Sequence, residues 1–283
     1  MDEYRLIRDY QNGEIIFDRR YGSTNTFEKN NYPVGYNLGQ SGNTPSQNLV
    51  DAYEMIDGTP FDWNNPEHKS NPYANRDPRL AMSILTNNVE FKDRTIEAWT
   101  GGRDGKGVIH ATRTGYYIYK FIDPNLDLLQ NRTSVHHWVI MRYAEILLSY
   151  AEAMNEAYGP TGNVGYRLNA VRALNQVRNR VGVEMPAVPT AISKEELREK
   201  IRNERRVELA FEDHRFWDVR RWMIAPETLG APLRGVEITK ISDEEFEYNP
   251  IEVEKRTFEP KMYLYSIPQA DLNTTGWVQN PLW

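Results

Sequence analysis

Two glutamates in the last third of the chain have the type and spacing that acid–base hydrolysis of a glycosidic bond requires. Glu204 and Glu208 stand four residues apart, which places them on one face of a helix. At about 100° per residue, Ile201, Glu204, Glu208 and Phe211 fall within roughly 40° of one direction. A glycosidase needs two carboxyl groups about 5–10 Å apart across an open cleft. The two glutamates are therefore a candidate catalytic pair.

The setting of these glutamates favours a structural role instead. They lie inside an apolar stripe, and arginines are frequent in the surrounding sequence. A buried carboxylate must be paired, and arginines around it would hold it ionised, whereas a general acid needs a raised pKa. We therefore expect no catalytic residue but a structural ion cluster, with these members: Arg142, Glu204, Arg205, Glu208, Arg215 and Arg220.

Patterns for nucleophiles, metals and phosphates are weak elsewhere in the sequence. The chain has no G-x-S-x-G motif. His136 and His137 are neighbours, which do not face each other on a helix, so we expect a packing or helix-start role rather than a metal site. The glycine-rich run 101–107 fits neither P-loop nor dinucleotide spacing. The oxygen-rich turn 62–65 lacks EF-hand spacing, which makes calcium a weak candidate, and we expect no cofactor.

Aromatic residues on loops suggest a different chemistry, because flat rings stack on the apolar faces of sugars. The chain contains 17 Tyr and 7 Trp. Trp63, Tyr73 and Trp99 stand in loop or strand-end contexts, where binding residues concentrate. Hydrogen-bonding side chains flank them, among which Asn64 and Arg103 are further candidates for ligand contact. The alternative for each ring is ordinary packing, most of all for Trp99, which ends a strand-like segment.

The elements that must carry the two glutamates are helices in the second half of the chain, residues 135–283. Apolar residues recur every three or four positions over 137–158 and 165–181, which predicts two helices. This pair resembles one tetratricopeptide unit in length and in its use of small residues. Ser193 and Glu196 form a capping box that starts a third helix.

The first part of the chain, residues 1–134, is rich in Gly, Pro, Asn and aromatic residues. Loops as long as those predicted here are usually functional, so this part is expected to face the ligand. The predicted strands are 14–17, 80–85 paired with 94–99, and 262–267, and the stretch 225–262 is predicted to be charged and irregular.

Composition limits the class of protein and its partners. The chain has 283 residues, of which 40% are hydrophobic and 26% charged, and this is ordinary for a globular protein. A net charge of −6 argues against nucleic acid as a partner. There is no cysteine, so disulfides are excluded. No apolar run approaches the roughly 18 residues that a membrane span needs.

Four ordered segments resemble those of the SusD/RagB family, the nutrient-binding lipoproteins of the bacterial outer membrane. The resemblance runs from about residue 15 to the end of the chain, and Asp213 departs from it by replacing the family's usual glycine. The matching segments are N-L-V-D-x-Y-E-M at 48–55, N-R-D-P-R at 75–79, R-Y-A-E-x-x-L-x-x-A-E-A at 142–153, and N-E-R-R-x-E-L-x-x-E at 203–212, followed by R-x-x-D at 215–218 and R-W at 221–222.

The resemblance implies a mainly α fold, a tetratricopeptide-like part of a helical superhelix with long loops and short β-hairpins. It implies that residues 1–283 form the C-terminal domain of such a protein. Residues 1–134 would be its loop-rich part and 135–283 its helical part. The N-terminal helical half and the lipoprotein signal are expected to lie outside this chain, which would leave part of the apolar face of 137–181 uncovered.

The resemblance also implies a function without chemistry. The protein would be a lipid-anchored subunit at the cell surface that binds an oligosaccharide, or a peptide, and delivers it to a SusC-like TonB-dependent transporter. Membrane contact would come only through an N-terminal lipid anchor absent from this chain. Two alternatives remain open. One is a glycoside hydrolase that uses the carboxylate pairs, and the other is a tetratricopeptide-like scaffold for protein interactions.

Overall fold

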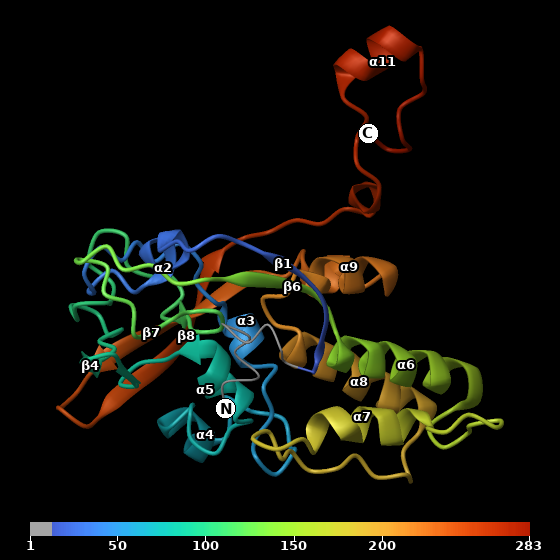
Figure 1. Cartoon of the computed structure of the whole chain (residues 1–283), viewed down its shortest axis with the longest axis horizontal. Coiled ribbons are helices and arrows are strands. Elements are labelled where there is room, and N and C mark those ends of the chain that lie inside the picture. Colours follow the sequence, from blue (N-terminus) through green and yellow to red (C-terminus); the bar gives the residue numbers. More distant parts are fainter. Residues whose placement is uncertain (1–12) are drawn as a thin grey trace.

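The computed structural model describes residues 13–283, and its longer helices form one half of the molecule (Figure 1). The helices α6, α7 and α8 bury a shared apolar core that includes Leu148, Leu174 and Ile201. The expected capping box of Ser193 and Glu196 is present at the start of α8 and is confirmed. The helices of this half are α6 (Tyr143–Tyr158), α7 (Ala170–Arg178), α8 (Lys194–Glu208), α9 (His214–Arg221) and α10 (Ala225–Thr228).

The first of these helices begins six residues later than predicted. Residues His137–Arg142 form strand β6, which pairs antiparallel with β1 (Ile15–Arg20). The run His-Trp-Val-Ile favours an extended backbone, since aromatic and β-branched residues pack well on a pleated surface. The expected helix start at the two histidines is therefore wrong. The imidazole of His137 instead lies 2.8 Å from a carboxylate oxygen of Asp18 on the partner strand.

Short elements joined by loops make up the other half of the molecule. Their shared core contains Tyr53, Tyr116 and Tyr117, all fully buried. The predicted pairing of 80–85 with 94–99 is wrong, because β2 pairs with β5 and β3 with β4. The elements are α2 (Thr26–Asn31), α3 (Gln47–Val50), α4 (Pro66–Ser70), α5 (Arg79–Ser83), β2 (Ile84–Leu85), β3 (Glu90–Phe91), β4 (Arg94–Thr95) and β5 (Tyr117–Ile118).

A long hairpin replaces the irregular stretch predicted for 225–262. Strands β7 (Leu233–Lys240) and β8 (Phe246–Glu254) pair antiparallel along their full length. Val236, Ile238 and Tyr248 are buried in the core of the loop-rich half. The hairpin therefore belongs structurally to that half, although it follows the helices in sequence. Figure 1 shows the turn of the hairpin at the left edge of the molecule, on the opposite side from α6, α7 and α8.

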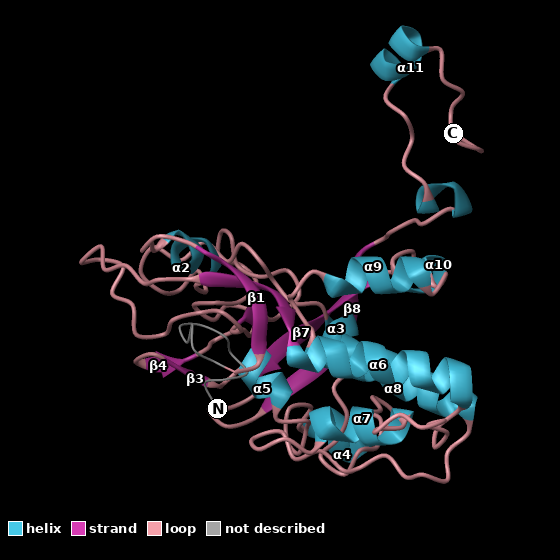
Figure 2. Ribbon diagram, turned by 45° about the vertical axis from the view of Figure 1, so that its right-hand side comes forward, coloured by secondary structure: helices cyan, strands magenta, loops and turns pink. Residues whose placement is uncertain are grey.

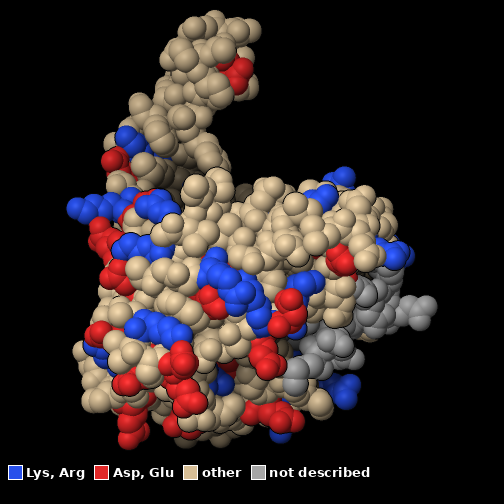
Figure 3. Space-filling view, turned by 90° about the vertical axis from the view of Figure 1, so that its left-hand side faces the viewer, with Lys and Arg blue, Asp and Glu red and all other residues tan. Residues whose placement is uncertain are grey.

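The C-terminal segment leaves the body of the molecule (Figures 1 and 2). It contains the 3₁₀ turn η1 (Pro260–Tyr263) and helix α11 (Gln269–Thr275), so the strand predicted at 262–267 is wrong. Its root is held by Arg220, which donates hydrogen bonds to the carbonyl oxygens of Met262 and Tyr263 at 2.8 and 2.9 Å. Asp271 is the only charged residue among the last twenty, and Figure 3 shows this arm almost free of charged side chains.

The prediction of a mainly α fold with a tetratricopeptide-like helical part, long loops and short strand pairs is confirmed. Part of the helical surface is uncovered, since Tyr143, Ile146 and Tyr166 are each more than two-fifths exposed on or beside α6 and α7. None of the helices within residues 13–283 has the length and apolar character to span a bilayer.

Candidate functional site

The two candidate glutamates lie in a buried ion network rather than in a cleft. Glu204 and Glu208 project from α8 and are at most 2% exposed. Arg79 bridges them, with Nη1 at 2.5 Å from Glu204 Oε1 and at 2.8 Å from Glu208 Oε2. Arg178 completes the coordination of Glu204 at 2.7 Å, and Arg180 donates two hydrogen bonds to Glu208. Both carboxylates are thus paired and closed to a substrate.

Only one of the four arginines expected around these glutamates contacts them. Arg142 lies 2.7 Å from Glu208. Arg205, although it neighbours Glu204 in sequence, turns to Asp218 and makes two hydrogen bonds of 2.9 and 3.1 Å there. Arg205 points away from Glu204 because successive residues on a helix are about 100° apart. Arg215 and Arg220 lie on α9 and are directed to other surroundings, so their expected place in the cluster is also wrong.

The network continues from Glu208 to a further buried carboxylate, Glu212. Arg142 binds Glu212 through Nε and Nη2 at 2.7 and 2.9 Å, and Lys120 lies 2.6 Å from the same carboxylate. Burial would raise the pKa of Glu208, but Arg180, Arg142 and Arg79 lower it well below its ordinary value. Burial, and to a smaller extent the positive charge of Arg142, lowers the pKa of Lys120 to about 8. A carboxyl group held ionised in this way cannot serve as a general acid.

The network joins the two halves of the molecule. Asp77 and Arg79 come from the loop-rich half and form a two-pronged ion pair with a shortest distance of 2.6 Å. Arg79 then reaches across to Glu204 and Glu208 on α8. Breaking a buried pair of this kind costs about 3–5 kcal/mol, since it leaves an uncompensated charge. The glutamates therefore serve the scaffold on which a binding site can be held.

The aromatic candidate Tyr73 lines an open pocket of about 610 Å³ in the loop-rich half. Its ring stands edge-on to the rings of Tyr116 and Tyr248, with centroids 6.1 and 5.3 Å away. Burial raises the pKa of Tyr73 well above its ordinary value, so its hydroxyl stays a neutral hydrogen-bonding group. Phe246 lies beside Tyr248 on β8 and lines the same pocket. Aromatic faces therefore form one wall of the pocket.

Amide side chains form the polar part of the same pocket. Asn71, Asn87 and Asn88 all line it, and the first and last of them are exposed. Asn87 is fixed, because its Oδ1 accepts from the backbone N–H of Ala98 at 3.1 Å and its Nδ2 lies 3.4 Å from the hydroxyl of Tyr248. Rings beside amides match the apolar faces and the hydroxyl pairs of a sugar.

Arg76 positions the loop that carries Tyr73. Its guanidinium donates to the carbonyl oxygens of Pro72, Val50 and Tyr53 at 2.6–2.7 Å. The guanidinium carbon also lies 4.1 Å from the centre of the Phe61 ring. The N-R-D-P-R segment thus has two structural tasks, because its first arginine fixes the pocket wall and its second enters the ion network.

The other candidate residues do not line this pocket. Trp63 is half-buried and donates from Nε1 to Asp51 at 3.0 Å. Trp99 packs against Phe246 with ring centroids 5.3 Å apart. Asn64 is exposed and bonds to Asp62 within its own turn, while Arg103 pairs with Glu97 at 2.5 Å. Of the five candidates for ligand contact, Tyr73 lines the pocket. For the other four, contact with a ligand stays a prediction. These four residues are Trp63, Trp99, Asn64 and Arg103.

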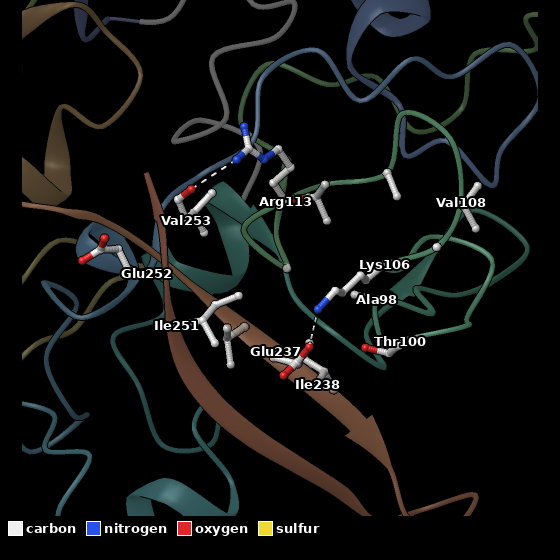
Figure 4. A pocket seen from close by; sticks show the side chains of 15 residues that line it. Ala98, Thr100, Lys106, Val108, Arg113, Glu237, Ile238, Ile251, Glu252 and Val253 are labelled. Atoms are coloured by element: carbon white, nitrogen blue, oxygen red, sulfur yellow. Dashed lines mark hydrogen bonds and ion pairs between the residues drawn. The ribbon is translucent and has the colours of Figure 1, made fainter. Parts of the chain in front are cut away.

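A second pocket of about 360 Å³ lies against both strands of the hairpin, β7 and β8 (Figure 4). Lys106 spans it to reach Glu237 on β7 at 2.6 Å, and Arg113 donates to the carbonyl oxygen of Val253 at 3.1 Å. Lys106, Glu237 and Arg113 are thus engaged with the protein. Among the described residues that line it, none is aromatic. The pocket at Tyr73 is the better candidate for a sugar.

The described part of the chain contains no cluster of side chains suited to binding a metal ion. Within residues 13–283 no group of three or more His, Asp or Glu side chains is arranged to hold an ion. In the turn considered for calcium, one oxygen of Asp62 already accepts from the backbone and the side chain of Asn64.

Comparison with known proteins assigns the chain to a family. A model described as the SusD family matches residues 13–283. The chain belongs to the SusD family. SusD-like protein P2 of Formosa agariphila is 34% identical over 120 residues, which are 41% of this chain and 22% of that protein.

Solved structures match all or nearly all of the chain. A SusD-like protein from Bacteroides fragilis has a TM-score of 0.81 and 31% identity, and covers 100% of this chain and 57% of its own. A SusD-like carbohydrate binding protein from the same organism has a TM-score of 0.76 and 30% identity, and covers 93% of this chain and 53% of its own. The chain therefore spans little more than half the length of these relatives.

Several residues of the site were not among the sequence candidates. Phe246 and Tyr248 alternate in a strand that the charged residues around it conceal, and this alternation is the signal that could have found them. Arg178, Arg180 and Lys120 carry no local pattern, because their partners lie far along the chain.

Proposed function

We propose that this chain is the ligand-binding part of a SusD-like protein that captures an oligosaccharide at the bacterial cell surface. The observation that carries the proposal is the pocket in which Tyr73, Tyr248 and Phe246 stand beside Asn87 and Asn88. Rings supply stacking area at a low cost in conformational entropy, and the amides offer both donors and acceptors for hydroxyl groups. Membership of the family, and the carbohydrate-binding relative, support this choice of ligand.

The remaining parts of the proposal rest on the family. The protein delivers its ligand to a SusC-like TonB-dependent transporter and is held at the outer membrane by a lipid anchor. It performs no hydrolysis, which agrees with the burial and pairing of Glu204 and Glu208. Trp63 and Trp99 remain proposed as further aromatic contacts.

Calorimetry against neutral hexasaccharides of the malto, cello, xylo and laminari series tests the site. We expect one series to bind, and Phe246→Ala and Asn88→Ala each to weaken it by about fivefold or more, which corresponds to at least ~1 kcal/mol. The matched control is Trp217→Ala, since this ring is 63% exposed on α9 and lines none of the pockets described above.

Two results would count against this function. Equal binding by the parent and both pocket variants, with normal melting, would move the site elsewhere. Release of shorter sugars during incubation would instead select the hydrolase.

A further inference from the structure

A third pocket, of about 560 Å³, lies at the open end of the hairpin and is lined by four arginines. They come from four separate elements or loops: Arg206 from α8, Arg215 from α9, Arg234 from β7, and Arg256 from the segment after β8. The carboxylates that line it are Asp51 and Glu227. Four arginines against two carboxylates give a formal charge of +2, on a chain whose net charge is −6.

Within residues 13–283, three of these arginines form no ion pair with a carboxylate: Arg206, Arg215 and Arg256. Asp51 is engaged by Arg234 at 2.6 Å. Arg206 donates to the backbone carbonyl oxygen of Asn48, which is a neutral acceptor. Within residues 13–283, no ion pair involves Arg206 or Arg215, and no hydrogen bond of the Arg215 side chain is found.

Fixed backbone contacts hold this charge in place. Arg256 donates from Nε to Ala231 and from Nη2 to Thr228, at 2.8 and 3.1 Å, both backbone carbonyls. Burial, and after it the neighbouring guanidinium of Arg215, lowers the pKa of Arg206 to about 10. Two cations are thus held near each other and partly out of water, which is costly unless an anion joins them.

We propose that this pocket is an oxyanion site, where Arg206 and Arg215 together bind a sulfate or carboxylate group. The guanidinium fork matches the paired oxygens of both groups. The anion can arrive as a free ion or as the acidic substituent of a sugar. The inference does not rest on the proposed sugar pocket, because that pocket lies at the turn end of the hairpin, around Phe246 and Tyr248.

Calorimetry at constant ionic strength tests the site with four probes: sodium sulfate, glucose 6-sulfate, glucuronate and glucose. We expect the charged probes to bind in the millimolar range and glucose to show no binding here. Arg206→Gln and Arg215→Gln should each weaken binding by about tenfold, since each removes a charge-assisted hydrogen-bond donor. Arg172→Gln, an exposed arginine on α7, is the matched control and should bind like the parent.

A variant that is expected to bind more tightly separates an effect on the site from a loss of folding, because an unfolded protein would bind less. Glu227→Gln removes an exposed carboxylate at the pocket and should tighten binding severalfold. Glucose 6-sulfate binding more tightly than sulfate assigns the site to an acidic sugar, and equal affinity assigns it to a free anion. Both results support an oxyanion site. The proposal is overturned if no charged probe binds at about 10 mM, or if Arg206→Gln and Arg215→Gln melt normally and bind like the parent.

Discussion

Arginine side chains have opposite surroundings in the buried ion network and in the arginine-lined pocket. In the network, Arg79, Arg142 and Arg178 each meet at least one carboxylate at 2.9 Å or less. In the pocket, Arg206 and Arg215 meet none within residues 13–283. Compensated charge fixes the backbone, whereas uncompensated charge that the fold holds in place is available to a ligand.

The largest test of this comparison removes a central carboxylate of the network. Glu208→Ala leaves Arg79, Arg142 and Arg180 without their shared partner. We expect a loss of about 3–5 kcal/mol in the free energy of unfolding, measured by chemical denaturation. Glu199→Ala on the exposed face of α8 is the control and should cost less than ~1 kcal/mol. If Glu208→Ala lowered the free energy of unfolding no more than Glu199→Ala does, the ion network would not stabilise the fold.

A smaller effect is expected on acidification, because protonation leaves the side chains in place. The pKa values of Glu208 and Glu212 are lowered in the folded protein, so the unfolded chain takes up protons first as the pH falls. Stability should therefore be lost progressively below about pH 4.5. In Glu208→Gln this loss should be shallower, and thermal melts from pH 3 to 7 measure it. An unchanged slope would contradict the assignment.

At alkaline pH, Lys120 of the same ion network should also make the free energy of unfolding depend on pH. Lys120 has a pKa of about 8 in the fold and 10.5 when unperturbed. The unfolded chain keeps this proton longer as the pH rises, so the contribution of Lys120 to stability increases from about pH 8 to 10.5.

The smallest effect is expected in the pocket. Arg206→Gln removes an uncompensated charge and keeps a donor for the carbonyl oxygen of Asn48. We expect the free energy of unfolding to change by less than ~1 kcal/mol, whereas Arg79→Gln should cost several times more. Equal costs for the two substitutions would erase the distinction between the two sets of arginines.

The buried face of α8 could be predicted from sequence because it is a local property. The three- and four-residue spacing of Ile201, Glu204 and Glu208 fixes one helical face, and an apolar setting demands partners for the carboxylates. The identity of those partners could not be predicted. Arg79 lies 125 residues before Glu204, and only the tertiary fold brings them together.

The candidate binding residues show a similar limit. Local context places Trp63, Tyr73 and Trp99 on loops, but it does not say which ring faces a pocket. Only Tyr73 lines the aromatic pocket, because Trp63 is turned toward Asp51 and Trp99 toward Phe246. The hairpin was missed for another reason. Its outward-facing residues are charged, and they mask the alternation of buried ones on the other face.

The projecting C-terminal arm has a mechanical consequence. Its root is clamped at Arg220, whose guanidinium lies 4.4 Å from the ring centre of Phe216 and 5.2 Å from that of Tyr265. Farther out, within the described chain, its hydrogen bonds join the arm to itself, as between Gln279 and Ile267. The arm is therefore attached to the body only near its root within the described chain, and a force on its tip acts there on α9 and on the start of α10.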